Sequence, residues 1–355
     1  MKRILPFCVL LITIVACENM SEEEIEQQIS SGVVLIQNQS YYEVTLPNEE
    51  TIYFSYYDEE DGIQGLKFDL DSVELATSYG TGFFISSDGK IATNNHVVSN
   101  VVEDKDVHKS IAKFFDALKG YLAVQYEEYD EAYDKMCSLV LYAFYDDNVS
   151  VSQFNELRDM RDALENERDN YARLYNYLDN MRAKDCDISY HNEVGIAYNN
   201  TYVTNNGDFI PCVITKRDAE NDLAIIQLKD KRTPEDKYVF EVPEEDPLVT
   251  YSTSEKITKK ISDDKNAKLF MVSFNLGPVL ALTQDGVKSQ FNNGTISQKT
   301  SKRIMYSIPA LHGSSGSPVV NLQGQLVAVN FASVGTTGNF NYGIRVKQLR
   351  DLLDK

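Results

Sequence analysis

The sequence predicts a mainly β protein that is interrupted by one long helical hairpin. From about residue 190 onward, short hydrophobic runs such as "DLAIIQL" and "RIMYSI" alternate with Gly, Asn and Asp, as strands alternate with turns. Between residues 103 and 185, apolar residues instead recur three and four positions apart, and no proline interrupts them. That spacing is the period of an amphipathic helix.

The N-terminal β region contains the clearest hairpin signal of the chain. The apolar run "GVVLIQN" at residues 32–38 and the tyrosine-rich residues 39–76 precede it. The segment "GTGFFISSDGKIATNNHVV" at residues 80–98 then alternates in polarity around Asp88-Gly89. An Asp-Gly pair between alternating hydrophobic residues is typical of a tight β-hairpin turn. We therefore expect the chain to reverse at this dipeptide.

The helical segment is expected to form a separate insertion over residues 103–185. Two amphipathic stretches are joined near "DDNVSVSQ" at residues 146–153. Such a pair most simply forms an antiparallel coiled-coil hairpin. Its aromatic residues are then interpreted as the core between the helices and not as a ligand site.

The N-terminus has the features of an export signal. Basic residues and an apolar run over residues 4–15 precede Ala16 and Cys17. The letters "IVAC" resemble the bacterial lipobox, which implies a signal peptide over residues 1–16, lipidation of Cys17 and a tether over residues 17–30. The alternative is a plain secretory signal with an incidental cysteine. Lipidation predicts an extracytoplasmic, membrane-anchored lipoprotein in the periplasm or on the surface of a bacterium.

Charge and cysteine usage exclude several classes of function. Asp and Glu number 54 against 34 Lys and Arg, for a formal charge of −20. This balance argues against nucleic acid, which needs a basic surface. After Cys17 the chain has three cysteines, and their spacing fits no zinc site: Cys137, Cys186 and Cys212. We expect free thiols, although one pair could form in an oxidising compartment. No metal or cofactor is expected.

Three segments contain the residue types that nucleophilic serine catalysis requires. The reaction needs a serine, an imidazole that takes its proton, a carboxylate that orients the imidazole, and N–H groups aimed at the oxyanion. His96 lies in "TNNHVV", where a strand is expected to end. Asp222 opens the apolar run "DLAIIQL", and Ser314 and Ser315 lie in the glycine-flanked turn "HGSSGSP". The turn alone would not distinguish a catalytic serine from a structural bend.

Together these segments resemble the chymotrypsin-fold serine proteases of the bacterial HtrA/Deg type. The order His, Asp, Ser is the chymotrypsin order. The resemblance covers residues 31–100 and 190–355, with the insertion outside it. It implies a chymotrypsin-like double β-barrel carrying a long inserted α-helical hairpin, and no PDZ domain is expected after the protease domain.

The resemblance assigns the catalytic roles residue by residue. It makes His96 the general base, Asp222 the carboxylate that orients it, and Ser315 the nucleophile. The backbone N–H groups of Gly313 and Ser315 would form the oxyanion hole. Asp218 is the second choice for the orienting carboxylate.

The turn also departs from the family pattern. Ser314 falls where relatives carry Asn or Asp, so its side chain is expected to point away from substrate. Ser317 replaces a second glycine and could tighten the turn behind the nucleophile. The resemblance further implies a substrate pocket lined by His312, Asn330, Phe331 and Ala332, although a solvated loop position is the alternative for His312.

The predicted function is a cofactor-independent serine endopeptidase that hydrolyses extracytoplasmic proteins through an acyl-enzyme. The alternative is a weakly active or inactive protease-fold scaffold that binds a protein partner through the helical insertion. A third possibility is a latent protease that becomes active when a partner binds that insertion.

Overall fold

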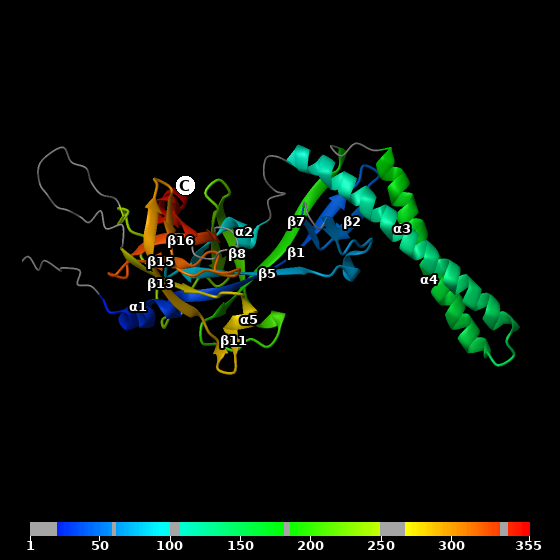
Figure 1. Cartoon of the computed structure of the whole chain (residues 1–355), viewed down its shortest axis with the longest axis horizontal. Helices are drawn as coiled ribbons and strands as arrows, with labels where there is room; N and C mark the ends of the chain where they lie inside the picture. Colours follow the sequence, from blue (N-terminus) through cyan, green and yellow to red (C-terminus); the bar gives the residue numbers. More distant parts are fainter. Residues whose placement is uncertain (1–19, 59–61, 100–106, 181–184, 249–266, 334–339) are drawn as a thin grey trace, which may run out of the picture. The chain divides into compact units, whose positions relative to one another are not determined.

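The computed structural model confirms the mainly β fold with two barrels and an inserted helical pair (Figure 1). Cys17 and the signal peptide predicted for residues 1–16 lie outside the described residues. In the part of the chain that the structure describes, no helix is long and apolar enough to cross a membrane. The described residues are 20–58, 62–99, 107–180, 185–248, 267–333 and 340–355.

The first barrel is antiparallel in its β5–β6, β6–β9 and β8–β9 pairings and is closed by pairing between β1 and β7. The predicted hairpin at Asp88-Gly89 is confirmed, since Phe83 pairs with Ala92 on either side of it and Gly89 has φ +80°. In ring order the strands are β1 (Val33–Thr45), β5 (Ala76–Phe84), β6 (Lys90–Thr93), β9 (Leu223–Leu228), β8 (Ile210–Asp218) and β7 (Asp187–Tyr198).

The second barrel is closed and entirely antiparallel. Its strands, in ring order, are β10 (Lys268–Ser273), β13 (Gln290–Lys299), β14 (Arg303–Tyr306), β17 (Asn341–Arg345), β16 (Leu326–Ser333) and β15 (Pro318–Val320). The short helix α5 (Pro278–Ala281) and the ribbon β11 (Leu282–Thr283)–β12 (Gly286–Val287) lie between β10 and β13 in the chain. Helix α6 (Val346–Asp354) follows β17 and buries Leu349 and Leu352.

The tether predicted for residues 17–30 is helical over much of its length. Helix α1 spans Glu22–Ile29 and is followed by a 3-10 turn, Ser30–Gly32. Ser21 and Glu24 form a capping box, in which each side chain accepts a hydrogen bond from the backbone of the other. Ile25 and Ile29 are fully buried in the core. The acidic "SEEE" segment therefore starts a packed helix.

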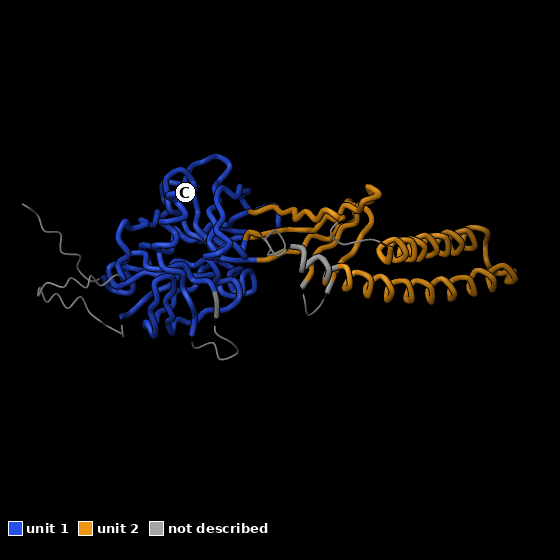
Figure 2. Tube along the Cα trace, turned by 90° about the horizontal axis from the view of Figure 1, so that it is seen from above, with its two compact units in different colours: residues 1–36, 79–97, 195–355 blue, residues 37–78, 98–194 orange. Residues whose placement is uncertain are grey.

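The chain divides into two compact units, coloured separately in Figure 2. The first unit comprises residues 1–36, 79–97 and 195–355, and the second comprises residues 37–78 and 98–194. Strands β1 and β7 each contribute residues to both units. The second unit therefore includes more than the insertion predicted for residues 103–185.

The second unit contains the inserted helices α3 (Val107–Tyr145) and α4 (Val151–Asp179), which lie antiparallel. Arg168 of α4 stacks 4.5 Å from the ring centre of Tyr133 and hydrogen-bonds Asp130 of α3. At one end the helices pack against the hydrophobic side chains of β1, β2 (Thr51–Phe54) and β4 (Gly62–Gln64); β3 (Tyr56–Asp58) pairs with β4. The helical residues buried in this cluster are Phe115, Leu118, Leu122, Tyr171, Leu174 and Leu178.

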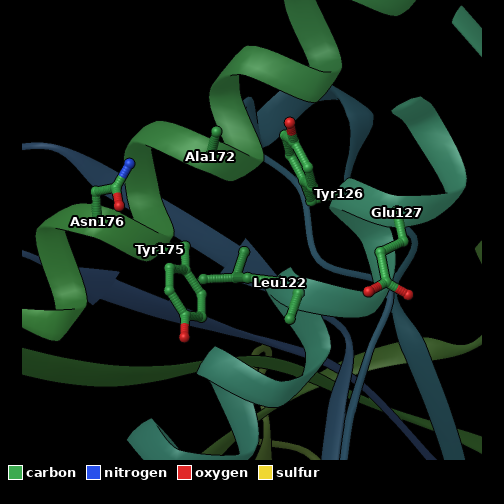
Figure 3. Close-up of a pocket in the computed structure, with 7 residues that line it drawn as sticks. Leu122, Tyr126, Glu127, Ala172, Tyr175 and Asn176 are labelled. Carbon is green, nitrogen blue, oxygen red and sulfur yellow. The ribbon is translucent and has the colours of Figure 1, made fainter. Parts of the chain in front are cut away.

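A pocket of about 360 Å³ opens between α3 and α4 (Figure 3). Ala123 and Ala172 leave space there because their side chains are short, and Tyr126 and Tyr175 flank it. The other lining residues are Leu122, Glu127 and Asn176. Its lining includes no serine, histidine or cysteine, so it does not offer the groups that serine catalysis requires.

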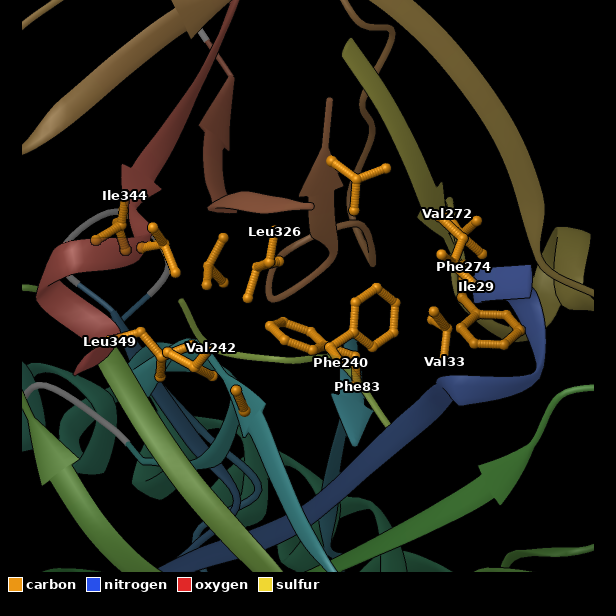
Figure 4. Close-up of a cluster of buried hydrophobic side chains, with 14 of the residues drawn as sticks. Ile29, Val33, Phe83, Phe240, Val242, Val272, Phe274, Leu326, Ile344 and Leu349 are labelled. Atoms are coloured by element: carbon orange, nitrogen blue, oxygen red, sulfur yellow. The ribbon is translucent and has the colours of Figure 1, made fainter. Parts of the chain in front are cut away.

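The first unit has a hydrophobic core cluster to which both barrels contribute (Figure 4), and the second barrel holds a further buried cluster that includes Leu269, Met271 and Val319. Phe83 and Phe240 pack edge to face at 5.0 Å, and Phe274 and Val272 of the second barrel belong to the same cluster. Offset or edge-on aromatic pairs of this kind fix the packing geometry as well as burying area. The core thus gives the site, which both barrels build, a rigid foundation.

Candidate active site

His96 projects from α2 (Asn95–Val98), a single helical turn that directly follows β6. Its ring atom Nδ1 lies 2.8 Å from Oδ2 of Asp222, and its backbone N–H donates to Oδ1 of the same carboxylate at 3.0 Å. Both carboxylate oxygens are therefore engaged by one residue. When Nδ1 carries the proton donated to Asp222, Nε2 is left as an acceptor, as a general base requires.

Asp222 is held at a tight turn immediately before β9. Its φ of +52° lies in the left-handed region, which Asp tolerates better than most residues. Asn94 donates from Nδ2 to the Asp222 carbonyl at 2.9 Å. The strand that follows is buried along its whole length. Turn and strand together fix the carboxylate against the imidazole.

Asp218, the second choice for the orienting carboxylate, binds residues other than His96. Its carboxylate accepts from the backbone and side chain of Asn221 and pairs with Lys355 at 3.0 Å. Burial tends to raise the pKa of Asp218, but the bonds from Asn221 and Lys355 outweigh it and leave that pKa lowered. The structure thus brings Asp222, and not Asp218, to His96.

The serine turn leaves two backbone N–H groups unused at the predicted oxyanion positions. The N–H groups of Ser314, Gly316 and Ser317 donate to carbonyl oxygens at 2.8–3.1 Å. Among the described residues, the N–H groups of Gly313 and Ser315 have no acceptor. Such donors are available to a developing oxyanion.

The orientation of the Gly313 N–H group is fixed by its peptide neighbour. The carbonyl of His312 accepts a hydrogen bond from the N–H of Leu276 at 2.5 Å. Because a trans peptide directs its C=O and N–H to opposite sides, the N–H of Gly313 points away from Leu276.

Thr81 of β5 secures the turn and was missed by the sequence reasoning. Its backbone N–H donates to the Ser315 carbonyl at 2.8 Å, and its hydroxyl donates to the Gly313 carbonyl at 2.7 Å. The same hydroxyl accepts from the N–H of Phe274. One residue of the first barrel thus hydrogen-bonds the carbonyl groups of both predicted oxyanion-hole residues. The only sequence signal for the role of Thr81 was its position in the segment "GTGFF".

Gly316 cannot carry a side chain in this arrangement. Its φ is +87°, and a Cβ built there would lie 2.0 Å from the Thr81 carbonyl oxygen and 2.3 Å from Oγ1 of Thr93. Gly313 has φ +90°, and its Cβ would lie 2.4 Å from the Phe274 carbonyl oxygen. Both glycines are therefore required by space as well as by backbone conformation.

Ser314 and Ser317 are buried and bind the turn internally. The Ser314 hydroxyl donates to the Leu311 carbonyl at 2.6 Å, which directs it into the protein. The Ser317 hydroxyl donates to the Ser314 carbonyl at 2.7 Å. The Ser317 hydroxyl is thus accommodated in the turn by a hydrogen bond.

Ser315 is half-buried between these two residues. Within the described residues, its hydroxyl makes no hydrogen bond to His96, so its role as nucleophile stays a prediction. Catalytic hydrogen bonds are often long in free enzymes and tighten when substrate binds. The structure shows the His96–Asp222 pair and, in the turn that carries Ser315, two amide donors without acceptors among the described residues.

The predicted pocket residues have different environments. Asn330 is buried, donates to the Ser314 carbonyl and accepts from the Tyr306 hydroxyl, so its side chain supports the turn from within. His312 is exposed. Phe331 is half-buried with the Arg303 guanidinium 4.6 Å from its ring centre. The side chain of Ala332 lies outside the described residues.

The described residues contain no cluster of three or more His, Cys, Asp or Glu side chains that could hold a metal ion. Cys137, Cys186 and Cys212 are free thiols, and Cys212 is buried. Burial raises the pKa of Cys186 to about 11 and that of Cys212 to about 12. Neither thiol is suited to act as a nucleophile near neutral pH.

The comparison with protein families agrees with the architecture. Residues 183–329 match the family model of the trypsin-like peptidase domain, a range that contains Asp222 and Ser315. With the two closed barrels, this match defines the fold as chymotrypsin-like. A serine endoprotease from Yersinia pestis is similar at 11% identity and a TM-score of 0.43, over 94% of this chain and 66% of that one. No curated protein matches the chain.

Proposed function

We propose that this protein is a serine endopeptidase that uses Ser315, His96 and Asp222. The observation that carries the proposal is the coincidence of two arrangements in one unit. The Asp222 carboxylate holds the His96 imidazole through both oxygens, and the N–H groups of Gly313 and Ser315 stand without acceptors beside the predicted nucleophile. The trypsin-like family match over residues 183–329 supports the same class.

In the proposed mechanism, the Ser315 hydroxyl attacks the scissile carbonyl carbon while Nε2 of His96 takes its proton. The N–H groups of Gly313 and Ser315 stabilise the oxyanion, and each such donor typically contributes about 10²–10³ in kcat. The C–N bond then breaks, and the leaving amine receives the proton from His96. Water next attacks the acyl-enzyme ester, again with His96 as base, and the serine is released. Asp222 stabilises the imidazolium in both steps.

The proposal is tested by labelling purified protein with a fluorophosphonate probe, which reacts only with an activated serine. We expect labelling of the wild type and of Ser314→Ala, and its loss in Ser315→Ala and His96→Ala. Labelling should fall toward acid pH because a protonated imidazole cannot accept the serine proton. A well-folded wild type that is not labelled, or a labelled Ser315→Ala, would refute the assignment.

We further propose that the enzyme is an extracytoplasmic lipoprotein of the HtrA/Deg type, acting on protein or peptide substrates and anchored through Cys17. The Met20 N–H donates to the Leu322 carbonyl at 2.9 Å, so residues from Met20 onward are attached to the first unit. At most about 3.6 Å per residue, the link from Cys17 to Met20 spans roughly 10 Å. Palmitate incorporation into the wild type but not into Cys17→Ser would support this anchor, and equal incorporation would exclude it.

A second candidate function is binding of a protein partner through the helical hairpin. It is favoured by apolar side chains that are exposed at the far end of the helices: Leu139, Leu141, Tyr142, Phe144, Tyr145 and Val151. Exposed apolar groups of this size commonly mark interaction surfaces. Deletion of this end, described in the Discussion, separates a partner-dependent protease from an autonomous one.

A further inference from the structure

A second group of exposed apolar side chains lies beside the serine turn. Val279 is 78% exposed, and the leucines at positions 276, 280, 282 and 311 are 39%, 46%, 43% and 53% exposed. Single exposed apolar residues are common, whereas several together mark a contact surface. We call these five residues the apolar patch: Leu276, Val279, Leu280, Leu282 and Leu311.

Backbone hydrogen bonds connect the apolar patch directly to the predicted oxyanion hole. The Leu276 N–H donates to the His312 carbonyl at 2.5 Å, and the Leu311 N–H donates to Oδ1 of Asn275 at 2.9 Å. The Val279 N–H donates to the Leu276 carbonyl at 3.2 Å, which starts α5 on the same segment. Gly313 packs against this segment too, since its Cβ would meet the N of Gly277 at 2.6 Å. The patch therefore adjoins the reacting centre.

Leu276 keeps a costly backbone conformation in this position. Its φ is +55°, in the left-handed region, where a leucine costs about 1–2 kcal/mol relative to the right-handed one. Glycine or asparagine would adopt this conformation at lower cost. Strained residues persist where their side chain or backbone serves a function. An exposed leucine at such a position indicates a use for its side chain.

The apolar patch and strand β16 adjoin opposite ends of the serine turn. Asn330 of β16 accepts from the Gly316 N–H and donates to the Ser317 carbonyl, after the nucleophile. Leu276 bonds His312, before it. We take the substrate chain to cross Ser315 with its acyl side along β16, and its leaving-amine side then runs toward the patch.

We propose that the apolar patch binds apolar side chains of the substrate segment that follows the scissile bond. The proposal rests on the proposed function and adds a substrate class to it: extended polypeptide with Leu, Ile, Val or Phe in the first few positions after the cleaved bond. The patch has no charged member, so its contribution to binding is burial of apolar surface. Such segments become accessible when a protein is unfolded.

The test compares cleavage of denatured casein with the rate of fluorophosphonate labelling, using the full chain. Cleavage requires binding of the peptide segment that leaves, whereas the probe loses only fluoride on reaction, so the ratio of the two rates isolates the patch. Sites mapped by mass spectrometry in wild-type digests should be enriched in apolar residues just after the scissile bond. In Val279→Ser/Leu280→Ser, we expect the ratio to fall about tenfold and the enrichment to disappear.

Two further variants make the result decisive. Val279→Asp changes only the most exposed member, so the fold should persist, and it should lower the ratio by placing a charge where apolar groups bind. Val213→Ser is the matched control, because Val213 lies on β8 outside the patch and is 42% exposed, close to the 46% of Leu280. An unchanged ratio in both patch variants, or a wild type without the enrichment, would overturn the inference. Absence of labelling in the wild type would instead refute the proposed function itself.

Discussion

The two compact units differ in which side chains lie in an environment opposite to their polarity. In the first unit, polar residues are buried around the serine turn, and Thr81, Ser314, Ser317 and Asn330 all find hydrogen-bond partners there. In the second unit, apolar residues such as Tyr142 and Phe144 are exposed at the end of the helical hairpin. Buried, satisfied polar networks fix one geometry, whereas exposed apolar groups depend on what covers them. The first unit therefore fixes the geometry of its buried polar groups, whereas the second leaves apolar surface exposed at the end of its helices.

The largest loss of activity is expected from Asp222→Asn in the first unit, and it tests whether that unit positions the catalytic groups. An amide would favour the wrong imidazole tautomer, and such a change lowers kcat by about 10⁴ in triads of this kind. Asp218→Asn is the matched control, because Asp218 bonds Asn221 and Lys355 and not His96. Its kcat should stay within about threefold of wild type. Peptidase assays that show equal losses in both variants would contradict the assignment of Asp222.

The half-buried thiol of Cys186 and the buried thiol of Cys212 should react far more slowly than fully accessible thiols. Cys186 belongs to the second unit and Cys212 to the first, with pKa values raised by burial to about 11 and about 12. Because the thiolate is the nucleophile, only about one molecule in 10³ and in 10⁴, respectively, is reactive at pH 8. Reactivity should rise about tenfold per pH unit below these values.

The thiol experiment uses iodoacetamide at pH 8 and site-resolved mass spectrometry. Both cysteines should be alkylated rapidly in urea and slowly in the native protein, by about two to three orders of magnitude. Native alkylation of Cys212 at the rate seen in urea would show that the first unit opens readily, against the rigidity inferred for it.

A pair of glycine substitutions should have opposite signs in the two units. Gly316→Ala in the first unit places a methyl group 2.0 Å from the Thr81 carbonyl oxygen at φ +87°. We expect a loss of at least about 3 kcal/mol in the free energy of unfolding, together with loss of fluorophosphonate labelling. Gly120→Ala in α3 meets no atom within 4 Å and should stabilise its unit by about 0.5–1 kcal/mol. Denaturant melts of both variants measure the difference, and destabilisation by Gly120→Ala would contradict the structure around α3.

Local patterns in the sequence predicted the strands and the helical pair, whereas the two barrels and the pairing of His96 with Asp222 were implied by the family resemblance that the three motifs carry. Alternation, the 3.6-residue period and the three motifs are all readable within short windows. The role of Thr81 was not predictable in this way, since its hydroxyl bonds the Gly313 carbonyl across 232 positions. The boundaries of the two units were also not predictable from the sequence, because the long strands β1 and β7 each contribute residues to both units. Helix α1 was missed although Ser21 and Glu24 have the capping-box spacing, because its acidic residues were interpreted as a tether.

The smallest effect is expected from shortening the helical hairpin, and it tests whether the second unit controls the first. Asp130 and Arg168 face each other across the helices, so residues 131–167 can be replaced by a four-residue Gly/Ser/Asn turn. The retained part keeps its hydrophobic contacts with the strands, including Leu118, Leu122 and Leu174. If the protease is autonomous, fluorophosphonate labelling should stay within about twofold of wild type, since burial of Leu118 and Leu122 still fixes the helices at this end. Loss of labelling with an unchanged melting temperature would instead mean that the hairpin's far end is needed to assemble the site, and the exposed aromatic residues there would become the surface on which an activating partner acts.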